Sequence, residues 1–192
     1  MIPLDHAHTH LHDLRITECL KLESLPANMH MMLPSLTELH IEDCPRFESF
    51  PEGGLPSNLN DMRLMRLKNC SRLLGSLKGA LGDTCSLKSL WIGKVDAECF
   101  PDEGLLPLSL TSLYIFGTSN LEKLDYKGLY QLSSLQVLVI CDCPNLQSLP
   151  EEGLPKSISF LHLNNCPLLK QRCQKEGGED WEKITHIQTL LI

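Results

Sequence analysis

The sequence predicts an α/β fold made mostly of parallel β-strands and coil, because one apolar pattern repeats along the chain with a short period and a strand-like inner spacing. The pattern reads L-x-x-L-x-I-x-x-C-x-x-L-x-x-L-P and returns about every 25 residues. This period is typical of leucine-rich repeats and is too short for a propeller blade or an ankyrin pair. Seven copies are expected, with ninth positions at residues 19, 44, 70, 95, 118, 143 and 166.

Each copy should contribute one short strand. Its fourth and sixth residues, such as Leu39 and Ile41, are two apart and therefore share one face of the strand, whereas the residues between them point the other way. A single repeat cannot bury its own apolar residues, so neighbouring repeats must stack into one continuous core. We therefore expect a solenoid or horseshoe of about seven repeats, with the third, fifth and seventh residues of each repeat on the concave side.

The connections between repeats are of two kinds. Those at 51–56, 101–107 and 150–155 are rich in proline and glycine and should stay extended. Those at 77–82 and 127–132 can form a helical turn. The convex side should therefore carry few helices, each a single turn at most.

Length and composition fit one domain: the chain has 192 residues, of which 42% are hydrophobic and 21% are charged. Residues 1–10 form a His-rich segment, 11–172 the repeat array and 173–192 a C-terminal capping segment. Trp181, Ile184 and Ile187 are large enough to close the end of the core. At the other end Leu14 and Ile16 stay uncovered unless residues 2–4 fold over them, which predicts self-association.

The charge and hydropathy patterns exclude two classes of partner. A formal net charge of -7 is opposite to the basic stripe that nucleic-acid binding requires. No apolar run approaches the roughly 20 residues of a membrane-spanning helix, and the first residues lack the features of a secretory signal. We expect a location in the cytoplasm or the nucleus.

Neither a cofactor nor a metal nor an enzymatic activity is expected. Five of the nine cysteines stand at the ninth position of a repeat, which predicts buried, reduced thiols, although Cys141 lies elsewhere and could be exposed. A metal-dependent enzyme would have to bind zinc through His6, His8 and His10, but short His-rich tracts bind metal weakly without being metal sites. The chain contains no phosphate-binding loop, Gly-x-Ser-x-Gly elbow or Cys-x-x-Cys pair.

The residues predicted to face the concave side change in character along the array. Early repeats present charges of both signs, whereas later repeats place aromatic and aliphatic side chains next to one another. Such a patch usually binds a partner, although a flanking domain could also cover it. The candidate partner-binding residues are Arg15, His40, Arg66, Trp91, Tyr114, Phe116, Val139 and His162.

Three features of the sequence are similar to those of a known family. They are the Cys-Pro pairs at 44–45, 143–144 and 166–167, the Glu-Gly-Leu-Pro linker at 152–155, and the ending from Cys166 to Ile187. The chain resembles the C-terminal leucine-rich repeats of plant coiled-coil nucleotide-binding disease-resistance proteins, which are intracellular immune receptors.

The resemblance implies that the repeats recognise a pathogen effector or a guarded host protein and hold the receptor's own nucleotide-binding domain inactive. An alternative is the substrate-binding repeat domain of a ubiquitin-ligase subunit or another scaffold. A ligase adaptor is expected to carry an F-box-like helical segment ahead of its repeats, and ten residues precede Leu11 here.

Overall fold

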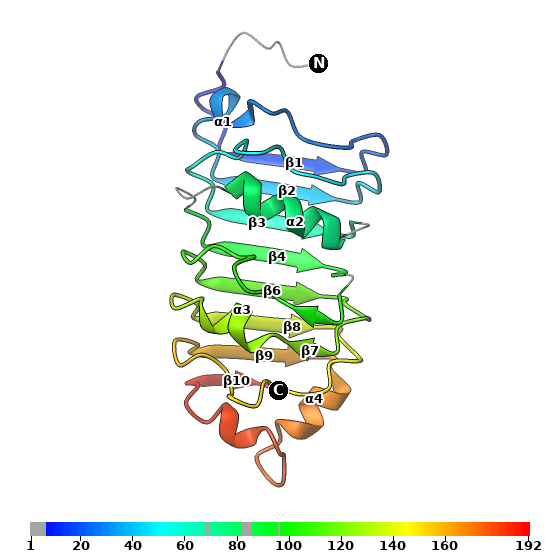
Figure 1. The fold of residues 1–192 in the computed structure, drawn as a ribbon, viewed down its shortest axis with the longest axis vertical. Helices are drawn as coiled ribbons and strands as arrows, with labels where there is room; N and C mark the ends of the chain where they lie inside the picture. The colour runs from blue at the N-terminus through cyan, green and yellow to red at the C-terminus, as the bar shows by residue number, and fades with distance from the viewer. Residues whose placement is uncertain (1–6, 68–69, 82–85, 96) are drawn as a thin grey trace.

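The computed structural model describes residues 7–67, 70–81, 86–95 and 97–192. Its main feature is an eight-stranded sheet whose strands stack in chain order along the longest axis of the molecule (Figure 1). Every neighbouring pair is parallel, which confirms the predicted class of fold. The strands are β1 (Asp13–Thr17), β2 (Glu38–Glu42), β3 (Asp61–Met65), β4 (Ser89–Gly93), β6 (Ser112–Phe116), β8 (Val137–Cys141), β9 (Phe160–Asn164) and β10 (Thr189–Leu191).

Burial alternates along these strands because their side chains point to opposite faces of the sheet. In β6, Leu113 and Ile115 are fully buried, whereas Ser112, Tyr114 and Phe116 are partly exposed. The buried residues of successive strands pack into one hydrophobic core that runs along the stack. The first, third and fifth residues of each five-residue strand form the opposite side of the sheet, which we call the open face.

The register of β3 corrects the frame predicted for the third repeat. Met62 pairs with Leu39 and Leu64 pairs with Ile41, so both enter the core. The repeat therefore runs through Leu59, Met62, Leu64 and Leu67 instead of Met62, Met65, Leu67 and Cys70. Apolar residues at 62, 64, 65 and 67 fit either frame, and the cysteine at 70 favoured the wrong one.

This shift lengthens the connection that follows β3 and leaves room for a helix longer than the single turn expected. Helix α2 (Cys70–Leu81) has 12 residues and lies in front of the sheet in Figure 1. Its buried residues follow helical spacing: Leu73, Leu74, Leu77, Ala80 and Leu81. Helices α1 (Met29–Met32) and α3 (Tyr126–Tyr130), which also lie between strands, are short.

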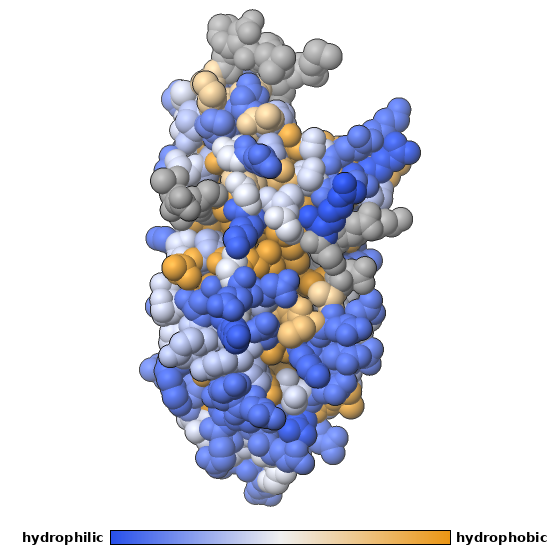
Figure 2. All heavy atoms as spheres, viewed as in Figure 1, coloured by the Kyte–Doolittle hydropathy of each residue, from blue (hydrophilic) through white to orange (hydrophobic). Residues whose placement is uncertain are grey.

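The proline- and glycine-rich connections at 51–56, 101–107 and 150–155 contain turns and no helix, as predicted. Two further connections pair in parallel as β5 (Cys99–Phe100) and β7 (Lys123–Leu124). The face seen in Figure 2 is largely hydrophilic, with hydrophobic residues visible between the polar ones. None of the described helices combines the length and the apolar character needed to cross a membrane.

The residue at the eighth position of each repeat has a positive φ. The φ angles of Glu18, Asp43, Arg66, Lys94, Asp142 and Asn165 lie between 51° and 57°, and Gly117 occupies the equivalent place. This conformation turns the chain out of the strand, and from the second repeat onward the ninth residue enters the core.

Cysteine suits the ninth position because its thiol fills a small buried space and donates to a carbonyl oxygen. The Sγ atoms of Cys44, Cys143 and Cys166 lie 3.3, 3.4 and 3.3 Å from the carbonyl oxygen two residues earlier. Thr118 makes the same contact through Oγ1 at 3.1 Å. The predicted burial is confirmed for these three cysteines, but Cys19 is exposed, and Cys70 starts α2 instead of ending a strand.

The C-terminal segment both covers the core and extends the sheet. Helix α4 (Pro167–Arg172) and the 3₁₀ helix η1 (Trp181–Lys183) precede β10, which pairs with β9. Ile184 and Ile187 are buried. The extra strand was not expected from the sequence, because residues 189–191 do not continue the repeat pattern.

The core is less well covered at the other end of the stack. Leu14 and Ile16 in β1 are partly exposed, whereas Leu39 and Ile41, their partners in β2, are fully buried. Residues 2–4, which were considered as a cover for this end, lie outside the described residues.

Candidate functional site

The middle residues of successive strands form one column along the open face. The parallel register places Arg15, His40, Arg63, Trp91, Tyr114, Val139 and His162 side by side in this order. Phe116 is the last residue of β6 and lies in the next column. All predicted site residues except Arg66 therefore lie in strands and on the open face.

Three aromatic rings stack in the middle of this face. The ring centroids of Trp91 and Tyr114 are 3.8 Å apart with an interplanar angle of 9°, and those of Trp91 and Phe116 are 5.6 Å apart with the same angle. The indole Nε1 donates to Ser89 Oγ at 3.1 Å, which helps to fix the orientation of the indole. All three rings are partly exposed, so they present a rigid apolar surface to a partner.

The stacked rings form one wall of an apolar hollow with a volume of about 510 Å³. Val139 and Cys141 are each only 7% exposed. They therefore form the base of the hollow and offer little accessible surface. His162 is the one histidine among the lining residues. The hollow is lined by Trp91, Tyr114, Phe116, Val137, Val139, Cys141, Phe160 and His162.

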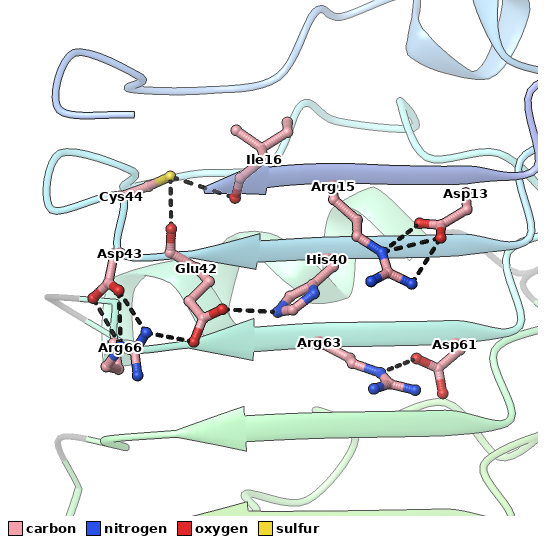
Figure 3. A network of polar contacts seen from close by, with 10 residues as sticks. All are labelled: Asp13, Arg15, Ile16, His40, Glu42, Asp43, Cys44, Asp61, Arg63 and Arg66. Atoms are coloured by element: carbon pink, nitrogen blue, oxygen red, sulfur yellow. Dashed lines mark hydrogen bonds and ion pairs between the residues drawn. The ribbon is translucent and has the colours of Figure 1, made fainter. Parts of the chain in front are cut away.

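The first three strands carry a network of charged groups on the open face (Figure 3). Arg15 binds Asp13 through Nη2 at 2.9 Å and through Nε at 3.0 Å. In the next strand, His40 Nε2 lies 3.5 Å from Glu42 Oε2. The open-face side chains of these strands thus contact one another within a strand.

Arg66 does not lie where the sequence placed it. It follows the end of β3 in the positive-φ position, and its Nη2 lies 2.7 Å from both Glu42 Oε1 and Asp43 Oδ2. The hydrogen bond from Arg66 lowers the pKa of Asp43, and the same contact raises the pKa of Arg66. Arg66 is therefore at the edge of the open face, held by two carboxylates.

Arg63 takes the place that had been given to Arg66, and it joins the charged and the apolar halves of the face. Its Nε donates to Asp61 Oδ1 at 2.9 Å, and its Cζ lies 4.8 Å from the centroid of the Trp91 ring. A guanidinium over an indole ring is a cation–π contact. The sequence could have indicated Arg63 only through the correct frame of the third repeat.

Neither Cys141 nor Cys173 has the lowered pKa that a nucleophilic thiol needs. Cys141 is buried, so the expectation that it could be exposed is wrong, and this burial raises its pKa. Burial also raises the pKa of Cys173 to about 12. Among the described residues, no three His, Cys, Asp or Glu side chains are grouped as a metal ion would require. His8 and His10 are exposed, and His6 lies outside the described part.

Comparison with known proteins identifies a class: the chain is similar to plant disease resistance proteins, as its motifs predicted. It is 37% identical over 163 residues to At3g14460, a candidate disease resistance protein of Arabidopsis thaliana, and 27% identical over 165 residues to the disease resistance protein RPP4 of the same plant. Each match covers 84% of this chain. A candidate disease resistance protein of Solanum bulbocastanum, RGA4, is 46% identical over 52 residues, which are 26% of this chain. No protein-family profile matches.

The chain spans only a small part of these relatives. The matched regions are 11% of At3g14460, 13% of RPP4 and 5% of RGA4. These similarities support a role in plant immunity, and the partners of this chain have to be argued from its own surface.

Proposed function

We propose that the chain is a leucine-rich-repeat array of about seven repeats, closed by a C-terminal cap, that acts as the protein-recognition module of a plant immune receptor. Its open face is the concave side of the array and binds a pathogen effector, a guarded host protein or the receptor's own nucleotide-binding domain. The module works without a cofactor and without an enzymatic activity, in the cytoplasm or the nucleus.

The stacked rings of Trp91, Tyr114 and Phe116 beside the apolar hollow are the observation that carries this proposal. Large aromatic side chains supply much of the binding energy at protein interfaces, especially where a pocket excludes water. Apolar patches of this kind on a folded protein usually mark an interface. A domain of the same receptor and a foreign protein would both fit this chemistry.

The charged half of the open face serves orientation more than affinity. Its arginine, histidine and carboxylate side chains already pair with one another, so a partner gains little from replacing these contacts. Charges around an apolar centre instead select the partner and its orientation.

A substrate-binding domain of a ubiquitin-ligase subunit would need a similar surface and remains the alternative function. The similarity to plant disease resistance proteins favours the immune receptor, because three such relatives match this chain. The identity of the captured partner separates the two functions. A ligase subunit would capture a ligase substrate, whereas an immune receptor would capture an effector, a guarded protein or a nucleotide-binding domain.

The test is affinity capture from extracts of healthy and infected leaves. The native chain is compared with a variant in which Trp91, Tyr114 and Phe116 are replaced by alanine. The control variant carries Tyr126→Ala and Tyr130→Ala, which remove another pair of neighbouring rings, 5.2 Å apart, from α3. Circular dichroism and thermal unfolding establish that all three proteins are folded.

We expect the native chain and the Tyr126/Tyr130 variant to capture the same partner. The variant that lacks Trp91, Tyr114 and Phe116 should not capture it. Equal capture by all three proteins would contradict the assignment of the open face. Capture by none of them would contradict the proposal that this chain recognises a protein by itself.

A further inference from the structure

Arg63 differs from the other arginines of the open face in how its guanidinium is bound. Arg15 and Arg66 each use both Nε and an Nη atom to bind carboxylates. Arg63 binds Asp61 through Nε alone, and within the part of the chain that the structure describes its two Nη groups make no hydrogen bond. Its side chain is 43% exposed, so these groups are accessible.

The position of this guanidinium is fixed by its two contacts. Asp61 holds Nε, and the indole of Trp91 lies under Cζ at 4.8 Å. A guanidinium held in this way has lost little freedom when it binds a further group, and its two Nη groups match the two oxygens of a carboxylate. The chemistry of Arg63 therefore fits an acidic group of a partner.

Trp91 connects this cation to the hollow, since one face of its ring meets Arg63 and the ring also lines the hollow. None of the eight lining residues is acidic, so no side chain of the hollow itself competes for Arg63. A volume of about 510 Å³ lies within the range of ligand pockets and accepts one or two large apolar side chains.

The distances suit an extended peptide that crosses the strands. Arg63 in β3 and Val139, at the base of the hollow in β8, are three strand spacings apart, about 14.4 Å. Side chains four residues apart in an extended peptide lie on one side, about 13.2 Å apart. A peptide whose apolar side chain enters the hollow can thus bring a carboxylate four residues away to Arg63.

We propose that Arg63 and the apolar hollow form one two-part site for a peptide segment, in which a large apolar side chain fills the hollow and an Asp or Glu four residues away binds Arg63. This site rests on the proposed function, because it names the kind of segment that the recognition surface takes. It makes Arg63, which the sequence pattern did not single out, the residue that sets the specificity for acidic partners.

Arg15 provides the matched control. It lies in the same column of the open face and binds the aspartate two residues before it, as Arg63 does. Its register partner is His40 in place of an aromatic ring, and it lies at the far end of the sheet from the hollow.

The experiment selects peptides from a random twelve-residue phage-displayed library against the full chain, Arg63→Gln and Arg15→Gln. We expect the native chain and Arg15→Gln to enrich peptides with a large apolar residue and an acidic residue four positions away. Arg63→Gln should keep the apolar residue and lose the acidic one. Thermal unfolding checks that both variants remain folded.

A second measurement keeps the test independent of any variant's folding. One selected peptide is synthesised with its acidic residue intact and with that residue changed to the amide, and both are titrated against the native chain by following tryptophan fluorescence. We expect the native chain to bind the acidic peptide at least ten-fold more tightly than the amide peptide. Arg63→Gln should bind the two peptides equally.

Three results would overturn the site: no peptide is selected, the selected peptides show no acidic preference, or Arg63→Gln retains that preference. The recognition function survives each of these results if a protein partner is still captured through the aromatic residues. Conversely, acidic peptides that bind through Arg63 while no leaf protein is captured would support the site and contradict the proposed function.

Discussion

Asp180 is a buried carboxylate in the C-terminal segment that binds three partners. Its side chain is fully buried and accepts hydrogen bonds from Arg172 Nε at 3.0 Å, Lys183 Nζ at 2.8 Å and the Leu149 amide at 3.0 Å. It thereby ties α4 and η1 to the chain that follows β8. Removing one partner of a buried ion pair is costly because it leaves the other charges without compensation.

We predict that Asp180→Asn lowers the free energy of unfolding by about 3 kcal/mol, as measured by urea denaturation. The control is Glu179→Gln, which removes the neighbouring carboxylate that also binds Arg172 but is 71% exposed. Its effect should stay below about 1 kcal/mol, since exposed ion pairs contribute little. Equal effects of the two substitutions would contradict the role given to Asp180.

The same residue predicts a pH dependence. Burial raises the pKa of Asp180, but the bonds from Arg172, Lys183 and the Leu149 amide outweigh burial and hold the pKa below its ordinary value of 3.8. A carboxylate with a lowered pKa in the folded state stabilises above its unfolded pKa, and this stabilisation is lost as the pH falls through the folded pKa.

The native chain should therefore lose more stability than Asp180→Asn as the pH falls from 5 to 2. Urea denaturation at a series of pH values measures this difference. A constant difference in the free energy of unfolding over that range would show that Asp180 does not titrate as described.

Predictions from the sequence were least reliable for individual residues. Trp91, Tyr114 and Phe116 could be predicted as neighbours, because their places in the repeat determine their register. Arg63 could not, since the apolar residues around it allow two frames that differ by three positions. Only the pairing of Leu64 with Ile41 decides between these frames.

At the scale of elements, α2 offers a direct test of the helix that the corrected frame creates. Gly75 and Gly79 lie in its interior and are exposed, and a Cβ atom at either position would meet no other atom within 4 Å. Glycine weakens a helix because it loses more backbone freedom on folding than alanine does.

We predict that Gly75→Ala and Gly79→Ala each raise the free energy of unfolding by about 0.5 to 1 kcal/mol. The contrasting substitution is Gly128→Ala in α3, where a Cβ atom would overlap the carbonyl oxygen of Pro101, and it should destabilise the protein. Denaturation in urea measures all three. If the α2 substitutions destabilise, residues 70–81 do not form the helix described here.

Element lengths could be predicted only where the repeat pattern is complete. The extended connections follow from proline and glycine, which fix the backbone locally. Helix α2 was expected to be a single turn because the wrong frame assigned its first residue, Cys70, to the ninth position of the preceding repeat. Strand β10 pairs with β9 over three residues through backbone groups. Backbone pairing of this length does not require particular side chains, so the sequence did not indicate it.

At the scale of the whole molecule, the partly exposed Leu14 and Ile16 predict self-association through the β1 end of the stack. An edge strand offers unpaired backbone groups, and the apolar residues beside it favour contact with a second copy. The apparent mass measured by light scattering should therefore rise with protein concentration. Ile16→Lys should reduce this rise, whereas a concentration-independent monomer for the native chain would contradict the prediction.

The overall architecture could be predicted from the sequence because stacking of identical units is a local rule that applies again at each repeat. The hollow could not, since its volume depends on the orientation of ring side chains and on how deeply Val139 and Cys141 sit between their neighbours. Periodicity determines which side of a strand a residue occupies, and packing determines how much of that residue remains accessible.

The alternation of burial along each strand has a consequence for how this molecule can evolve. In β6 the core depends on Leu113 and Ile115, whereas the partly exposed Ser112, Tyr114 and Phe116 lie on the open face, outside that core. Substitutions outside the core usually cost less stability than substitutions within it. The recognition that we propose for the open face can therefore change one codon at a time, because codons for core residues and codons for open-face residues alternate along the gene.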